Sequence, residues 1–225
     1  GIWMDRYLGK AEYGKFNFII SFLFIFQPMI NFGLDEVIIR RLSKTGIEES
    51  LLLGSAAFVK LFGMILSWFI LAMTAQLMDI DYTVKLLIFV YCLSSLFAPL
   101  NNIESFLYSK LKINKLVFMR SILFLIISGI KIILILFEKN LSYFVILSCF
   151  EMILMVLLNL IIYKEQGKSI LNWRVDKKLS VDLTKESFPI VLDSFITKGL
   201  AKIDQFFIVQ MTSFVALGMY SASVK

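Results

Sequence analysis

The chain has 225 residues, of which 59% are hydrophobic, and a formal net charge of +6. Its mean hydropathy of +0.82 and its apolar content, above the roughly 45 to 50% of soluble proteins, weigh against a soluble domain. There is no histidine, and the two cysteines, Cys92 and Cys149, lie deep in apolar runs. The composition therefore argues against imidazole catalysis, a zinc site with histidine ligands and a disulfide framework. We interpret both thiols as small core residues.

Six apolar segments are long enough to cross a bilayer as helices, since a hydrocarbon core of about 30 Å takes about 20 helical residues. They are 15–34, 51–78, 83–107, 115–137, 140–163 and 187–211. Their apolar runs are continuous rather than alternating, which favours helices over membrane strands. A hydroxyl cap at Ser187 and a preset φ at Pro189 predict the start of the sixth span. The predicted fold class is all-α, a polytopic transmembrane helix bundle.

Connections that are rich in lysine and arginine alternate along the chain with connections that are poor in them. From residue 34 onward, successive connections carry 3, 1, 4, 1 and 6 of these residues. Because cytoplasmic loops carry the excess of positive charge, this alternation places three connections in the cytoplasm: 35–50, 108–115 and 164–186. The basic stretch before the first span does not fit the alternation. Loops that face anionic lipid explain the net charge, so we do not expect nucleic-acid binding.

The connection 164–186 is the one long polar segment between spans. Apolar residues such as Leu171, Trp173 and Leu179 interleave with its cations, which is typical of a helix at the membrane surface with Trp173 at headgroup depth. A solvated linker fits the same composition, and the sequence leaves both interpretations open.

Nine ionisable side chains fall inside the predicted spans. Each costs on the order of 2.5 to 3.5 kcal/mol at the bilayer centre, so we expect them to face the interior of the bundle. They are Lys60, Glu104, Arg120, Lys131, Glu151, Asp193, Lys198, Lys202 and Asp204. Glu104 and Arg120 lie near span ends, where snorkelling toward the membrane surface explains them. The others are interpreted as groups that line a polar cavity or, alternatively, as structural ion pairs.

The sixth predicted span carries four of these charges in the stretch DSFITKGLAKIDQFF. At 100° per residue, Asp193 and Asp204 fall on one face of a continuous helix, and the two lysines fall on the opposite face. The acids and the lysines of this helix therefore need partners on neighbouring helices or in water. Gly199 allows a close helix contact or a break.

These groups predict transport of an anion through the membrane. Ammonium groups at mid-depth attract an anion, and nearby carboxylates can exchange protons or sodium ions. The expected substrate-binding cations are Lys60, Lys131, Lys198 and Lys202, and the expected coupling or counter-charge acids are Glu151, Asp193 and Asp204. No cofactor or metal is expected beyond a coupling proton or sodium ion. A membrane enzyme is the rival class, but the outer connections 79–82 and 138–141 are short for a catalytic site.

Several short motifs occur in a recognisable order along the chain. They are YLGKAEYGKFNFIISFLF (7–24), NFGLDEVIIRRLSK (31–44), SKLKINK (109–115), ESFPIVLDSF (186–195) and IDQFFIVQMTSFVALGMYSASVK (203–225). In this order they resemble the O-antigen and polysaccharide flippases of the multidrug/oligosaccharidyl-lipid/polysaccharide exporter superfamily. The most specific pieces are the LG…YG entry, the NFGLD…RR exit and the closing IDQ…LG-x-YSA.

The resemblance implies a transporter of about twelve to fourteen helices in two lobes around a central cavity. The chain begins at Gly1 in a polar stretch and ends at Lys225 as another apolar element begins, so we expect a fragment with about six of these spans. The implied division is 1–163 for part of the N-terminal lobe, 164–186 for a cytoplasmic connection between lobes, and 187–225 for the start of the second lobe.

The implied task is to flip an undecaprenyl-pyrophosphate-linked oligosaccharide across the bacterial inner membrane by alternating access. Membrane lipids and other polysaccharide assembly proteins are the expected partners. Asp35 and Asp204 match acids that recur in the family, whereas the lysines match no motif. A drug or metabolite exporter of the same superfamily is the first alternative. Exporters of organic cations favour acidic cavities, however, whereas the charges expected here are more basic than acidic. A membrane-embedded glycan-processing enzyme and a non-transporting scaffold are the others.

Overall fold

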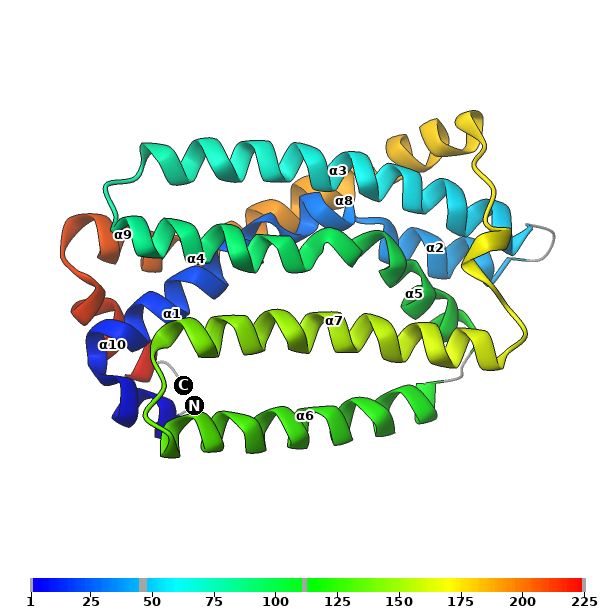
Figure 1. Cartoon of the computed structure of the whole chain (residues 1–225). Helices are drawn as coiled ribbons and strands as arrows, with labels where there is room; N and C mark the ends of the chain where they lie inside the picture. The colour runs from blue at the N-terminus through cyan, green and yellow to red at the C-terminus, as the bar shows by residue number, and fades with distance from the viewer. Residues whose placement is uncertain (1, 45–47, 111–112, 224–225) are drawn as a thin grey trace.

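The computed structural model describes residues 2–44, 48–110 and 113–223, and all regular secondary structure in these ranges is helical (Figure 1). The α-helices are α1 (Ile2–Asn31), α2 (Leu34–Leu42), α3 (Glu49–Leu77), α4 (Tyr82–Leu93), α5 (Asn102–Ser109), α6 (Ile113–Leu136), α7 (Leu141–Glu165), α8 (Lys177–Leu200), α9 (Ile203–Met211) and α10 (Phe214–Ser223). The 3-10 helices are η1 (Ser94–Asn101) and η2 (Ile170–Asn172). The all-α fold class is confirmed.

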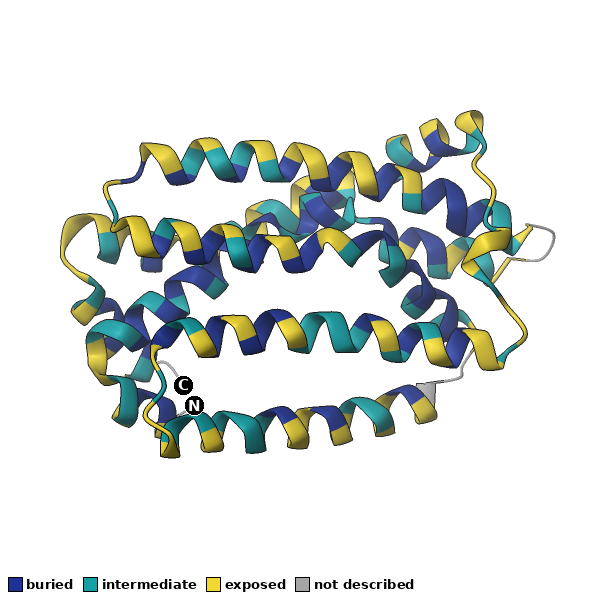
Figure 2. Cartoon of the chain, viewed as in Figure 1, coloured by how far each residue is buried: buried dark blue, intermediate teal, exposed yellow. Residues whose placement is uncertain are grey.

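Among the described residues, five helical segments are long and apolar enough to cross a membrane. They are Trp3–Asn31, Glu49–Leu77, Tyr82–Ser109, Asn114–Leu136 and Leu141–Glu165. Large apolar side chains such as Phe69 of α3 and Phe124 of α6 are exposed, as a lipid-facing surface requires. Exposed positions recur along both helices (Figure 2). The five segments agree with the first five predicted spans, although α1 starts earlier and bends at Gly9, whose φ is 75°.

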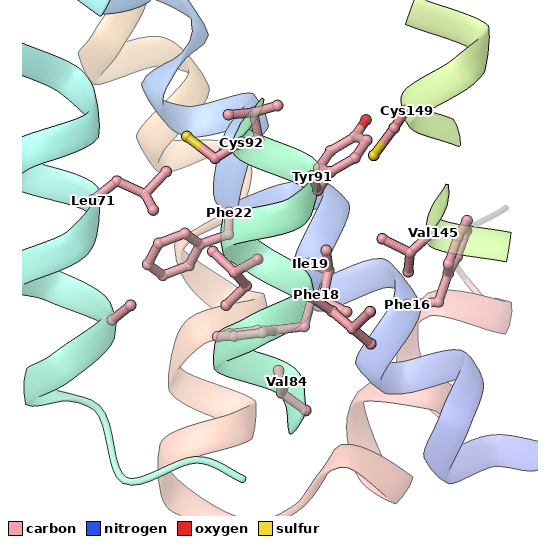
Figure 3. Packing of buried hydrophobic residues seen from close by; sticks show 14 of the residues in the cluster. Phe16, Phe18, Ile19, Phe22, Leu71, Val84, Tyr91, Cys92, Val145 and Cys149 are labelled. Atoms are coloured by element: carbon pink, nitrogen blue, oxygen red, sulfur yellow. The ribbon is translucent and has the colours of Figure 1, made fainter. Parts of the chain in front are cut away.

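Helix α1 forms the centre of the packed core (Figure 3). Its Phe18 and Phe22 are fully buried and belong to one cluster with Val84 of α4. Cys92 and Cys149 are buried and free in the same cluster, so their interpretation as core residues is confirmed. Since lipid tails are as apolar as these side chains, close packing rather than burial from water holds the helices together.

The sixth predicted span is wrong as a single helix. Asp176 caps a helix that starts ten residues before Ser187, because its Oδ1 accepts a hydrogen bond from the Leu179 N–H at 2.6 Å. The helix then ends at Leu200, just after Gly199, and α9 begins after a turn. The first ten residues of α8 are strongly charged, and neither α8 nor α9 is among the five candidate spans.

The connection before α8 is packed against α3. It contains η2, and the Arg174 N–H donates to the carbonyl oxygen of Ser50 at 3.3 Å. A Cβ atom at Gly54 would lie 2.2 Å from the carbonyl oxygen of Arg174, so only glycine at this position permits the approach. The segment therefore combines a docked loop with the start of a helix, and neither a free linker nor a single surface helix describes it.

Glu49 joins the three connections that were predicted to be cytoplasmic. Its carboxylate, at the start of α3, forms ion pairs with Lys110 at 2.6 Å and with Lys168 at 2.9 Å. These connections therefore gather at one end of the bundle (Figure 1), as the alternation of positive charge predicts.

Two arginines of α2 bind one carboxylate of α8 at the same end. Arg41 donates from Nε to Glu186 at 2.8 Å, and Arg40 donates to the other carboxylate oxygen. Burial disfavours the charged form of Glu186, but the hydrogen bonds from Arg41 and Arg40 outweigh burial and hold its pKa below the usual 4.5. A lowered pKa means that the contact stabilises the fold above pH 4.5 and that this contribution is lost as the pH falls through the lowered pKa.

We predict that Glu186→Gln lowers the stability of the detergent-solubilised protein at pH 7 by about 1 kcal/mol or less, because the contact is partly exposed. The measurement is the melting temperature of wild type and variant between pH 7 and pH 3, and the difference between them should shrink as the pH falls below about 4.5. Glu138→Gln, at an exposed residue without an ion pair in the described chain, should follow the wild-type curve. A difference for Glu186→Gln that is independent of pH would contradict the assignment.

Candidate functional site

A cavity of about 310 Å³ lies between α1, the span formed by α4, η1 and α5, and helices α6 and α7. Its volume is at the lower end of the range for small-molecule sites, about 300 to 1,000 Å³. The polar residues that line it are Gln27, Asn31, Ser94, Ser95, Asn101, Glu104, Arg120 and Asn159. Most of them are uncharged, so the sequence reasoning, which followed charges, missed them.

The 3-10 helix η1 arranges one wall of the cavity. Ser95, Ala98, Asn101 and Glu104 follow each other at intervals of three residues and all line the cavity. A 3-10 helix has three residues per turn, so side chains at this spacing stand in one column. Pro99, which has no backbone N–H to donate, lies within this stretch.

Glu104 and Arg120 face each other across the cavity wall. Arg120 donates from Nη1 to one oxygen of Glu104 at 2.8 Å, and its Nη2 lies 2.5 Å from the other oxygen. This is a two-point, charge-assisted contact between α5 and α6. The interpretation of these residues as snorkelling charges is therefore wrong, because each has its partner inside the bundle.

Asn159 of α7 is buried at the same cavity and is only 1% exposed. Neither its side-chain oxygen nor its side-chain nitrogen forms a hydrogen bond with any described residue. The Nε of Arg120 is likewise without a partner there. Two residues that line the cavity therefore carry buried donors and a buried acceptor without a partner in the described chain.

Lys198 and Lys202 lie beside the cavity. The Lys198 ammonium donates to Oε1 of Gln27 at 3.0 Å and lies 4.9 Å from the ring centre of Phe24. The Lys202 ammonium lies 5.9 Å from the same ring, and both Phe24 and Gln27 line the cavity. Among the described residues, no carboxylate is within ion-pair distance of either ammonium, although Asp35 acts on Lys198 electrostatically.

Lys60, the most deeply buried of the predicted cations, is engaged elsewhere. Its side chain is fully buried and its ammonium lies 2.6 Å from Oδ1 of Asp35, which also accepts a hydrogen bond from Ser105 at 3.3 Å. None of these residues lines the 310 Å³ cavity. This arrangement matches the structural ion pair that the sequence left open as an alternative.

The remaining predicted residues do not gather at the cavity. Lys131 and Glu151 form an ion pair of 3.1 Å between α6 and α7. Asp204 accepts from the hydroxyl of Tyr220 and from its neighbour's backbone N–H at 2.8 Å, which links α9 to α10. Asp193 is exposed on α8 and forms no ion pair in the part of the chain that the structure describes.

A second, larger groove of about 820 Å³ lies between α3 and α4. Its lining is mainly apolar, and side chains such as Phe69 and Leu93 are largely exposed. Such a surface is typical of a groove that lipid fills. Of these two sites, the smaller cavity has the more polar lining.

Comparison with known proteins identifies the family. The model of a family described as polysaccharide biosynthesis protein matches residues 2–225, and the chain belongs to this family. The resemblance inferred from the motifs is confirmed, and the apolar helices together with the family make the chain a multi-pass membrane protein. No curated protein and no solved structure matches the chain.

We predict that Asp35→Asn lowers the membrane abundance and the melting temperature of the protein, because it leaves the buried Lys60 charge without its anion. Loss of one partner of a buried pair costs about 3 to 5 kcal/mol, and we expect the lower end because Asp35 is 47% exposed. The double variant Lys60→Met with Asp35→Asn should recover most of the loss. A double variant with normal abundance but without surface polysaccharide would instead place Lys60 in substrate binding.

Proposed function

We propose that the protein is a flippase that moves undecaprenyl-pyrophosphate-linked O-antigen or another polysaccharide repeat unit across the bacterial inner membrane. One observation carries the proposal: Lys198 and Lys202, two ammonium groups without an ion-pair partner in the described part of the chain, lie beside a polar cavity in a membrane bundle of the polysaccharide biosynthesis family. Cations in this position suit an anion that has to leave water.

In this proposal the cavity holds part of the polar head of such a lipid during transport. The pyrophosphate would meet Lys198 and Lys202 beside Phe24, while the lipid tail stays in the bilayer. In this proposal residues 1–163 and 187–225 belong to two lobes that rock against each other, and 164–186 joins them on the cytoplasmic side. Asp193 is the proposed site for a coupling proton or sodium ion, because Glu151 and Asp204 already have partners.

An exporter of organic cations would need an excess of carboxylates at the cavity. Among the described residues that line it, the single carboxylate is Glu104, and Arg120 neutralises it. Lys198 and Lys202 therefore leave the region with net positive charge, which favours an anionic substrate over a cationic one.

We predict that Lys198→Ala and Lys202→Ala each lower surface polysaccharide at least tenfold, because each removes an ammonium that attracts the pyrophosphate. A tenfold effect corresponds to about 1.4 kcal/mol. The measurement is complementation of a strain that lacks its own copy of the gene, with membrane abundance followed by immunoblot.

Two further variants test whether the charge of the side chain and its position beside the cavity are what matter. Lys198→Arg should retain most of the activity because it keeps the charge. Lys85→Ala removes a lysine on α4 that has no ion pair in the described chain and does not line the cavity, so it should complement fully. Normal surface polysaccharide in both alanine variants at the site would contradict the proposal.

A further inference from the structure

The cavity has a cationic side and a neutral side. Lys198 and Lys202 lie beside Phe24 on α1. Glu104, Arg120 and Asn159 lie on α5, α6 and α7, where the charges of the first two cancel. Neither lysine lines the cavity itself, but a ligand in it would feel the positive charge of both ammoniums from the side of Phe24 and would meet residues without net charge on the other side.

Arg120 is not available as a free cation. Both of its terminal nitrogens are held by Glu104, so an incoming anion would be attracted by the guanidinium and repelled by the carboxylate. The Nε of Arg120 keeps its hydrogen, and this group has no acceptor among the described residues. The pair therefore carries little net charge and keeps the Nε–H as a buried donor without a partner in the described chain.

Asn159 supplies the complementary groups. Its amide has both a donor and an acceptor, and both are buried without a partner in the described chain. Leaving a buried polar group unsatisfied costs a protein about 1 to 3 kcal/mol, whereas an apolar side chain of similar shape avoids this cost. A ligand that uses both groups would offset the cost.

We propose that Asn159 and Arg120 bind an uncharged sugar ring of the lipid-linked substrate, a proposal that rests on the flippase function above. Hydroxyl and acetamido groups both donate and accept, so they can satisfy the oxygen and the nitrogen of Asn159 together. An ionised phosphate or carboxylate only accepts, and Glu104 repels it. The neutral side is therefore a sugar subsite, and the anion belongs beside the two lysines.

The volume of the cavity fixes the size of this ligand. About 310 Å³ is room for about ten water molecules at about 30 Å³ each. This is the scale of a single sugar ring rather than of a chain of sugars. The subsite would thus recognise the ring next to the pyrophosphate.

The test measures binding to the purified full protein in lipid nanodiscs. The probes are a short-chain polyprenyl pyrophosphate, the same lipid bearing one N-acetylglucosamine, and free N-acetylglucosamine. Asn159→Leu should weaken binding of the sugar-bearing lipid at least tenfold, change binding of the bare lipid less than twofold, and leave the melting temperature equal or higher. Lys198→Ala should weaken binding of both lipids by the same factor.

Asn102→Leu is the matched control. Asn102 is fully buried but does not line the cavity, and its amide donates to the carbonyl oxygen of Leu53 at 3.1 Å. Its replacement should lower the melting temperature and leave the Kd of the folded protein for both lipids within twofold. The two asparagines are thus expected to give opposite patterns.

The outcomes separate this inference from the flippase function. If both lipids bind equally to wild type and Asn159→Leu has no effect on binding, or weakens both equally, the sugar subsite is wrong and the flippase function stands. If free N-acetylglucosamine binds through Asn159 but neither lipid binds, the subsite stands and the flippase function is wrong.

A second variant is expected to change which sugar the subsite binds rather than to abolish binding. Glu104→Gln frees the charge of Arg120, so a lipid bearing one hexuronic acid should bind this variant at least fivefold more tightly than wild type, while the N-acetylglucosamine lipid gains nothing. Unchanged binding of the acidic lipid would overturn the view that Glu104 sets the neutral character of the subsite.

Discussion

The cost of placing a charge in low dielectric is the constraint on which this bundle depends. Ionised side chains within a membrane have to find an opposite charge or water, because lipid offers neither. Three ion pairs that each join two different helices meet this demand: Asp35 with Lys60, Glu104 with Arg120, and Lys131 with Glu151. The pairs hold α2 against α3, α5 against α6 and α6 against α7. Among the described residues, Lys198 and Lys202 are the cations beside the cavity that have no ion pair.

Irregular backbone shapes the place where these cations lie. The 3-10 helix η1 places Ser95, Ala98 and Asn101 in one column along the cavity wall, and 3-10 segments inside long helices often mark positions that can change shape. Helix α8 ends between Lys198 and Lys202, and both ammoniums still lie over the ring of Phe24, as their spacing of four residues would allow on a helix. The same break separates Asp204 from α8 and lets it bind Tyr220 of α10.

The sequence predicted the fold class because runs of about 20 apolar residues have few structural solutions in a membrane. Five spans and the common end of three basic connections followed from length and charge alone. The prediction of a sixth span was wrong because the helix start at Asp176 and the turn after Gly199 depend on local hydrogen bonds and backbone conformation. Hydropathy does not report these features. The positions of charges in the sequence also could not distinguish Lys60, which is paired with Asp35, from Lys198, which has no ion-pair partner among the described residues, because partners come from distant helices.

The uncharged residues of the cavity were the hardest part of the site to predict from the sequence. Asn159 is a single polar residue in an apolar run, and polar residues in membrane helices also serve as contacts between helices. The residues three and four positions before it that line the cavity are Val156 and Met155, so no repeating polar pattern indicated this site. Only the structure shows that four segments bring the lining residues to one space.

The most direct measurement of the central claim is the reactivity of single cysteines toward a charged, water-soluble thiol reagent. In a protein carrying Cys92→Ala and Cys149→Ala, the variants Lys198→Cys and Lys202→Cys would be compared with Lys60→Cys in the buried pair and Phe124→Cys on the lipid face. Thiolates form and react where water reaches them, so we expect the first two to react at least tenfold faster, and polyprenyl pyrophosphate to slow them. Reaction at positions 198 and 202 as slow as at position 60 would show that no wet cavity reaches these lysines.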